Sequence, residues 1–147
     1  MLVDCTINNK KYSFNSSPTK RVLDIIREDG ITSVKEGCGE GECGACSIFF
    51  NGKLVNSCLL VASQMDGSEI LTLDGLLEET KEIRESFIKE GAIQCGFCTG
   101  GFVLRAYDYI KQNGKKDENE LKKALDGNIC RCTGYQKIVE AILKSMR

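Results

Sequence analysis

Alternating apolar and polar residues mark the beginning of the chain as β-rich. Residues 2–6 (LVDCT) and 11–14 (KYSF) are short runs of this kind on either side of Asn8-Asn9. Asparagine tolerates the positive φ angles of tight turns, so the two runs read as a β-hairpin. Cys5 lies within the first run, and we interpret it as an ordinary small core residue.

A second hairpin is predicted further along. SIFF and KLVNSC flank Asn51-Gly52, which is a strong signal for a tight turn between two strands. A three-residue loop or a bulge at 51–53 would place Cys46 opposite Cys58 across this ladder. Residues 69–73 (EILTL) predict one more strand.

One helix is expected between the two hairpins. Ser17-Pro18 is followed by VLDII and then by Gly30. This order supplies an N-cap, a proline in the first turn, an apolar face and a glycine stop, so it predicts a helix over 18–29.

Beyond about Asp74 the apolar residues recur at helical spacing instead. Asp117 with Glu120 three residues later forms a capping box that predicts a helix start. The apolar positions that indicate helices are Ile83, Phe87 and Ile88; Phe102, Ala106, Tyr109 and Ile110; Leu121, Ala124 and Leu125; and Tyr135, Ile138, Val139, Ile142 and Met146. We therefore predict an α+β protein with two domains, residues 1–75 and 76–147.

Composition narrows the class of protein. The 147 residues are 41% hydrophobic and 28% charged, with a net charge of −1, as in a globular chain rather than a disordered one. No basic patch for nucleic acid is visible, and no apolar run approaches the roughly 18 residues of a spanning helix. Residues 1–10 lack the pattern of a signal peptide, so we expect a cytoplasmic protein.

Cysteine content indicates the chemistry. In a reducing cytosol so many cysteines indicate metal or redox work rather than disulfides. The chain has no histidine, which excludes Cys₂His₂ zinc fingers, Rieske centres and His-ligated haem built from this chain alone. Any tetrahedral site must be Cys₄. The nine cysteines are at positions 5, 38, 43, 46, 58, 95, 98, 130 and 132.

The first cysteine group is Cys38-x₄-Cys43-x₂-Cys46, followed by Cys58 after eleven residues. The first three match the spacing of plant-type [2Fe–2S] ferredoxins. The surrounding loop carries glycines at 37, 39, 41 and 44, which let backbone N–H groups turn toward an anionic cluster. A Cys₄ zinc site is the alternative, but zinc sites usually show paired knuckles on both sides.

The second group is Cys95-x₂-Cys98 with Cys130-x-Cys132. Each pair comes just before a predicted helix, where free N–H groups and the positive end of the helix dipole favour an anionic cluster. The CxxC by itself is also compatible with a thioredoxin-like redox pair or with half of a zinc site. Spacing alone favours an iron–sulfur cluster without excluding these alternatives.

Taken together, four segments resemble the iron–sulfur subunit of the xanthine dehydrogenase family of molybdenum hydroxylases. The resemblance spans nearly the whole chain, in the same order and with both cysteine groups complete. The segments are GCGEGECGAC at 37–46, NSC at 56–58, QCGFCTG at 94–100 and NICRCTGY at 128–135.

The resemblance implies a fold and a set of ligands. It implies an N-terminal β-grasp, ferredoxin-like domain and a C-terminal four-helix bundle, each with one [2Fe–2S] cluster. The first cluster would be held by Cys38, Cys43, Cys46 and Cys58, and the second by Cys95, Cys98, Cys130 and Cys132.

It also implies an electron-transfer role in a larger assembly. Gln94 and Cys132 would contact a molybdopterin on a large partner subunit, and an FAD-binding medium subunit would lie nearer the first cluster. Electrons would run from molybdenum to the flavin or another acceptor during hydroxylation of an N-heterocycle or an aldehyde. A free-standing two-cluster carrier is the competing hypothesis, and a zinc-stabilised interaction module is the third.

Overall fold

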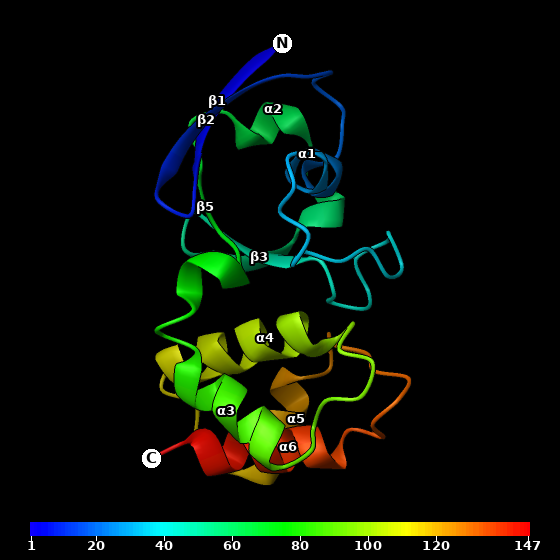
Figure 1. The fold of residues 1–147 in the computed structure, drawn as a ribbon, viewed down its shortest axis with the longest axis vertical. Helices are drawn as coiled ribbons and strands as arrows, with labels where there is room; N and C mark the ends of the chain where they lie inside the picture. Colours follow the sequence, from blue (N-terminus) through cyan, green and yellow to red (C-terminus); the bar gives the residue numbers. More distant parts are fainter.

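The computed structural model describes residues 1–147 and divides into a sheet region and a helical region (Figure 1). The β1–β2 and β3–β4 pairs and the β3–β5 pair are antiparallel, whereas β1 and β5 are parallel. In spatial order the strands are β2 (Lys10–Asn15), β1 (Leu2–Ile7), β5 (Glu69–Leu71), β3 (Ser47–Phe50) and β4 (Lys53–Asn56). The last strand in the chain is therefore the central one in the sheet.

The first predicted hairpin is confirmed. Leu2 pairs with Asn15 and Ile7 pairs with Lys10, so only two residues form the turn. Both of them, Asn8 and Asn9, have positive φ angles of 51° and 66°. Two consecutive positive φ values are the mark of a type I′ turn, whose twist matches that of the two strands.

The second hairpin is confirmed, but its predicted register is wrong. Phe50 pairs with Lys53 across a two-residue turn, so there is neither a three-residue loop nor a bulge. The ladder then continues to the backbone of Ser57, whose N–H donates to the carbonyl of Cys46 at 3.2 Å. Cys58 is thus one position beyond the residue opposite Cys46, and a 3₁₀ turn, η1 (Ser57–Leu59), turns the chain there.

The predicted helix over 18–29 is shorter than expected. Helix α1 (Val22–Glu28) begins only after Arg21, which is extended and pairs with Val61 as an isolated β-bridge. The carbonyls of Pro18 and Lys20 accept hydrogen bonds from the N–H groups at the start of α2 (Ala62–Met65). These long-range bonds hold residues 18–21 outside the helix, so Ser17 is not its N-cap.

The second half of the chain contains helices and no strands. Half of the predicted capping box is confirmed: the Asp117 carboxylate accepts the Glu120 N–H at 2.9 Å, but the Asp117 N–H donates to the Lys115 carbonyl instead of to the Glu120 side chain. Ile88 departs from the predicted apolar face and is 70% exposed. The elements are η2 (Leu73–Leu76), α3 (Lys81–Lys89), α4 (Thr99–Lys111), α5 (Glu118–Ala124) and α6 (Gln136–Ser145).

Buried apolar residues form two main clusters and a smaller one. One apolar cluster lies between α1 and the sheet, and the other lies among α3, α4, α5 and α6. A third cluster of Phe49, Leu76 and Leu104 joins β3 to α4, which lies directly against the sheet region in Figure 1. This packing brings the loop before β3 close to the first turn of α4. No helix has the length and apolar character that crossing a membrane requires.

Candidate metal centres

The loop between α1 and β3 wraps around the Cys38 sulfur. The backbone N–H groups of Glu40, Glu42 and Cys43 all point at this Sγ, at 3.3–3.4 Å. Gly39 and Gly41 within the loop have φ angles of +68° and +81°, which turn successive N–H groups inward. The result is a concave set of donors that favours an anion.

The four sulfurs of the first group form two pairs. The backbone N–H of each of Cys38 and Cys43 donates to the sulfur of the other at 3.4 Å, and the Cys46 thiol neighbours Cys58 closely enough to raise its pKa. Cys58 reaches Cys46 through the η1 turn rather than by direct cross-strand pairing. A methyl carbon on Gly37 would lie 2.6 Å from the Cys43 sulfur, so only glycine leaves room for this thiol.

The electrostatics of this group fit thiolate ligands. The N–H groups of Glu40 and Cys43 lower the pKa of the Cys38 thiol to about 7. Burial, followed by the neighbouring Cys46, raises the pKa of Cys58 to about 11. With this pKa the free Cys58 thiol is protonated at neutral pH. Metals ligate the thiolate, so binding of a cation would have to displace the Cys58 proton.

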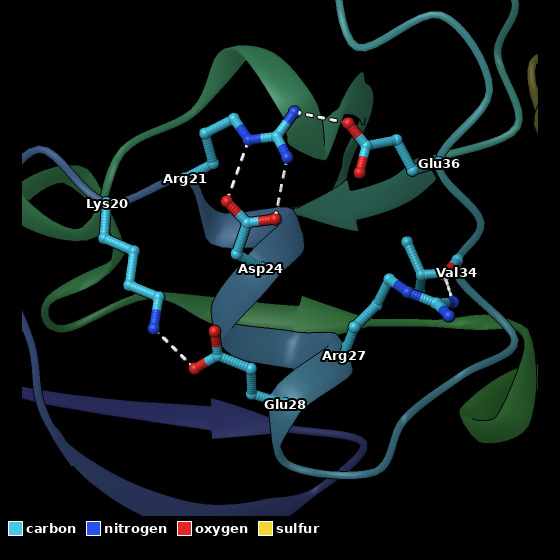
Figure 2. Close-up of polar contacts among 7 residues, drawn as sticks. All are labelled: Lys20, Arg21, Asp24, Arg27, Glu28, Val34 and Glu36. Carbon is cyan, nitrogen blue, oxygen red and sulfur yellow. Dashed lines mark hydrogen bonds and ion pairs between the residues drawn. The ribbon is translucent and has the colours of Figure 1, made fainter.

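Helix α1 holds the segment that leads into this loop (Figure 2). The Arg27 guanidinium donates to the carbonyls of Thr32 and Val34, at 3.2 and 2.6 Å. Arg21 donates to Asp24 on the same helix and to Glu36, two residues before Cys38. The approach to the first ligand is thereby fixed to a rigid element.

The second group is built from the starts of two helices. Cys98 is the N-cap residue of α4, and Cys130 and Cys132 lie in the loop before α6. The sulfurs again lie in pairs: those of Cys95 and Cys132 are 3.6 Å apart, and the Cys130 thiol neighbours Cys98 closely enough to raise its pKa. Segments more than thirty residues apart therefore supply one site.

Thr133 is a functional candidate that the sequence analysis did not identify. Its hydroxyl lies 3.1 Å from the Cys130 sulfur, and its backbone N–H donates to the same atom at 3.4 Å. Burial by itself would raise the pKa of Cys130, but the two Thr133 contacts, together with the Cys132 N–H and the Cys98 thiol, outweigh it and lower the pKa to about 7. Burial raises the pKa of the paired Cys98 to about 12. The only sequence signal for Thr133 was its place directly after the Cys-x-Cys pair.

The two groups share one cavity of about 480 Å³. Its lining includes Cys38 and Cys43 from the first group and all four cysteines of the second group. Beside it, the carbonyl of Cys43 accepts the backbone N–H of Ile129 at 3.0 Å. The two sites are thus neighbours that are joined by a hydrogen bond.

Cys5 is buried in the core, whereas Gln94 and Cys132 are exposed. Cys5 is 6% exposed within β1, in the core between the sheet and α1, and belongs to neither group. Gln94 is exposed in the loop between α3 and α4, immediately before Cys95, and Cys132 is exposed as well.

The donor set fits two iron–sulfur clusters. Eight thiols lie in two sets of four, which matches [2Fe–2S] clusters that each take four cysteine ligands. The arrangement defines the class: an iron–sulfur protein with two separate sets of four thiols.

Comparison with known proteins identifies the family. Residues 5–83 match the family described as 2Fe-2S iron-sulfur cluster binding domain, and residues 72–143 match the [2Fe-2S] binding domain family. The nicotinate dehydrogenase small FeS subunit of Eubacterium barkeri is 46% identical over 95% of this chain and 91% of its own. The xanthine dehydrogenase iron-sulfur-binding subunit of Escherichia coli O157:H7 is 39% identical over 96% and 91%. The chain belongs to the family of iron–sulfur subunits of xanthine dehydrogenase-like molybdenum hydroxylases.

Solved structures show the same likeness. The crystal structure of quinoline 2-oxidoreductase from Pseudomonas putida 86 matches 97% of this chain and 90% of that chain, with a TM-score of 0.90 and 38% identity. The aldehyde oxidoreductase from Desulfovibrio desulfuricans matches 98% of this chain with a TM-score of 0.89 and 32% identity. The match spans only 17% of that longer chain. The same fold therefore occurs in a separate polypeptide and within a larger one.

Proposed function

We propose that this chain is the electron-transfer subunit of a molybdenum hydroxylase, with one [2Fe–2S] cluster on each cysteine group. The sulfur pairs suggest how the ligands divide between irons. One iron of the first cluster would take Cys38 and Cys43, and the other would take the remaining pair. In the second cluster the pairs would be Cys95 with Cys132 and Cys98 with Cys130.

The hydrogen bond between Cys43 and Ile129 is the observation that carries the relay proposal. Ile129 directly precedes Cys130, so a ligand of one cluster is joined to a ligand of the other by a few covalent bonds and one hydrogen bond. When bound, the clusters supply one-electron acceptance and donation. A chain that held its two sites far apart would not offer so short a connection.

The outward ends of the two sites suggest where partners bind. We infer that Gln94 and Cys132 contact the molybdopterin of a large subunit, since both are exposed at the second site. Phe97 and Ile129 beside them are each 45% exposed, which leaves apolar surface for a protein partner. An FAD-binding subunit would then adjoin the first site, where Leu59, next to Cys58, is 61% exposed.

We further infer that residues 1–75 form the β-grasp, ferredoxin-like domain of the family and residues 76–147 its four-helix bundle. The two main apolar clusters support this division, because one draws on residues 3–70 and the other on residues 83–142. Helix α3 packs on α4 and α6, and α5 packs on the same two helices, as a closed bundle requires. We also propose a cytoplasmic location, because a chain that commits eight of its nine cysteines to cluster binding is typical of a reducing compartment.

The substrate of the assembly is proposed to be an N-heterocycle. The relatives named for nicotinate dehydrogenase and xanthine dehydrogenase support this class, as does the likeness to quinoline 2-oxidoreductase. The aldehyde oxidoreductases are less similar in sequence, at 29–32% identity among the structures. Assaying the purified assembly with nicotinate, xanthine and an aromatic aldehyde, with a dye as acceptor, tests this choice. Turnover of the aldehyde alone would contradict it.

Metal analysis with EPR of the dithionite-reduced protein tests the cluster assignment. We expect about four irons per chain and two distinct rhombic signals. Zinc in place of iron, with no EPR signal, would instead support the zinc-stabilised module.

Purification of the native complex separates a subunit from a free carrier. We expect molybdenum- and flavin-bearing chains to co-purify with this one through size exclusion. A cluster-loaded monomer that passes electrons to a soluble acceptor at the full physiological rate would favour the carrier.

A further inference from the structure

Arg21 lies between two carboxylates at the edge of the first cysteine loop (Figure 2). Its Nε and Nη2 donate to both oxygens of Asp24, each at 2.8 Å, and its Nη1 donates to Glu36 Oε1 at 2.8 Å. One edge of the guanidinium thus binds Asp24 of helix α1, and its remaining NH₂ group binds Glu36 of the loop. Bidentate contacts of this kind are geometrically specific.

The Arg21–Glu36 pair lies against the backbone that wraps Cys38. A methyl carbon on Gly39 would lie 3.1 Å from Glu36 Oε1 and 3.4 Å from Arg21 Nη1. Gly39 is the residue between Cys38 and Glu40, whose N–H donates to the Cys38 sulfur. The ion pair therefore borders the peptide units that carry these donors.

The backbone of the same arginine reaches the other end of the ligand set. Arg21 pairs with Val61 as a β-bridge, and the N–H of Val22 donates to the carbonyl of Leu60 at 2.9 Å. Residues 60 and 61 follow Cys58 by two and three positions. One residue is thus tied to the chain just before Cys38 and to the chain just after Cys58.

We propose that Arg21 is a positioning residue for the first cluster, and that its pairing with Glu36 adjusts the reduction potential of that cluster. The inference rests on the proposed assignment of Cys38, Cys43, Cys46 and Cys58 as ligands. Reduction adds negative charge to the cluster, so a nearby cation favours reduction and a nearby carboxylate opposes it.

This charge effect predicts shifts of opposite sign for the two partners. Arg21→Gln leaves Asp24 and Glu36 without their cation, so it lowers the potential of the first cluster. Glu36→Gln leaves the guanidinium less neutralised, so it raises that potential. Each change is expected to alter the equilibrium constant for reduction by about threefold to tenfold, where tenfold corresponds to about 59 mV for one electron.

A neighbouring ion pair supplies the matched control. Lys20, which lies just before α1, pairs with Glu28 at the end of that helix (Figure 2) and is not the partner of any residue of the cysteine loop. Lys20→Gln removes a cation and Glu28→Gln removes a carboxylate from this neighbouring pair, just as the test variants remove them from the Arg21–Glu36 pair. Neither control is expected to shift the reduction potential of the first cluster by more than a small fraction of the shift in the test variants.

EPR-monitored redox titration of the full assembly measures both potentials in one sample. The second cluster serves as the internal reference, because Arg21 contacts no part of its site. The proposal is supported if Arg21→Gln and Glu36→Gln shift the reduction potential of the first cluster alone, in opposite directions, and if Arg21→Lys retains most of the wild-type potential. Shifts of equal sign in Arg21→Gln and Glu36→Gln, or no shift, would overturn it. A wild-type protein without a first-cluster signal would instead refute the proposed function itself.

Discussion

The sulfur atoms of Cys95 and Cys132 lie 3.6 Å apart, although the two residues are 37 positions apart in the chain. One comes from the loop before α4 and the other from the loop before α6, so the second site exists only when both helices are in place. The first site shares none of these residues. The two ligand sets should therefore fail independently.

Cys132→Ser is expected to abolish or alter the EPR signal of the second cluster while the first signal keeps its shape and intensity. Serine is a poor replacement because clusters of this type are held by thiolates. Cys58→Ser is the matched variant and should give the reverse result. Iron content and EPR of the reduced variants check both, and joint loss of the two signals in either one would contradict independent sites.

Thr133→Val is expected to lower the reduction potential of the second cluster. It removes the hydroxyl that lies 3.1 Å from the Cys130 sulfur, and hydrogen bonds to cluster sulfurs favour the more negative, reduced state. One such bond contributes about 1 kcal/mol net, which corresponds to roughly 40 mV for one electron. Redox titration measures the change. Thr133→Ser keeps the hydroxyl and should stay near wild type, and an equal shift in both variants would rule out the hydroxyl as the cause.

Gly101→Ala should weaken the contact between the two sites. An added methyl carbon would lie 2.4 Å from the carbonyl oxygen of Gly44, in the cysteine loop. Overpacking against backbone costs about 1–3 kcal/mol, so we expect a lower free energy of unfolding in urea. We also expect weaker magnetic coupling between the two reduced clusters in EPR, because the loop must move away from α4.

Gly100→Ala is the control for this variant. The same methyl at position 100 meets its nearest atoms at 3.6 and 3.7 Å, which are ordinary contacts. Alanine is favoured over glycine in a helix by about 1 kcal/mol, so Gly100→Ala should be neutral or stabilising. Equal destabilisation by the two variants would show that local strain in the first turn of α4, and not the Gly44 contact, is responsible.

Cys5 should remain unreactive in the folded protein. Burial in the core, followed by the charge of Asp4, raises the pKa of its thiol to about 11. At pH 8 only about one Cys5 in a thousand would then be a thiolate, the form that reacts with alkylating reagents. Mass spectrometry after iodoacetamide treatment should find Cys5 unmodified until the protein is unfolded. Cys5→Ala should keep both EPR signals, and loss of either would contradict a purely structural role.

Local features of the sequence predicted most of the elements correctly. The turns at Asn8-Asn9 and Asn51-Gly52 depend on positive φ angles that these residues accept at little cost, so neighbouring residues suffice to identify them. The capping of α5 by Asp117 is equally local. The grouping of eight cysteines into two sets also followed from spacing, with the second set secured by the family resemblance.

The errors occurred where distant segments decide the outcome. The late start of α1 depends on hydrogen bonds from residues 62 and 63 to residues 18 and 20, about forty positions away. The position of Cys58 depends on where the β3–β4 ladder ends and η1 begins. Neither feature can be read from a short stretch of sequence. In both cases the backbone N–H and C=O groups find their hydrogen-bond partners in a segment that lies elsewhere in the chain.

The sequence by itself determined which residues we propose as cluster ligands, because thiols, loop glycines and helix starts are properties of short segments. Only the tertiary structure decided how these segments meet. Packing of Phe49 and Leu76 against Leu104 sets α4 on the sheet, and this places the carbonyl of Cys43 on the N–H of Ile129. The contact between the two sites is therefore a consequence of core packing, which no pattern of cysteine spacing can express.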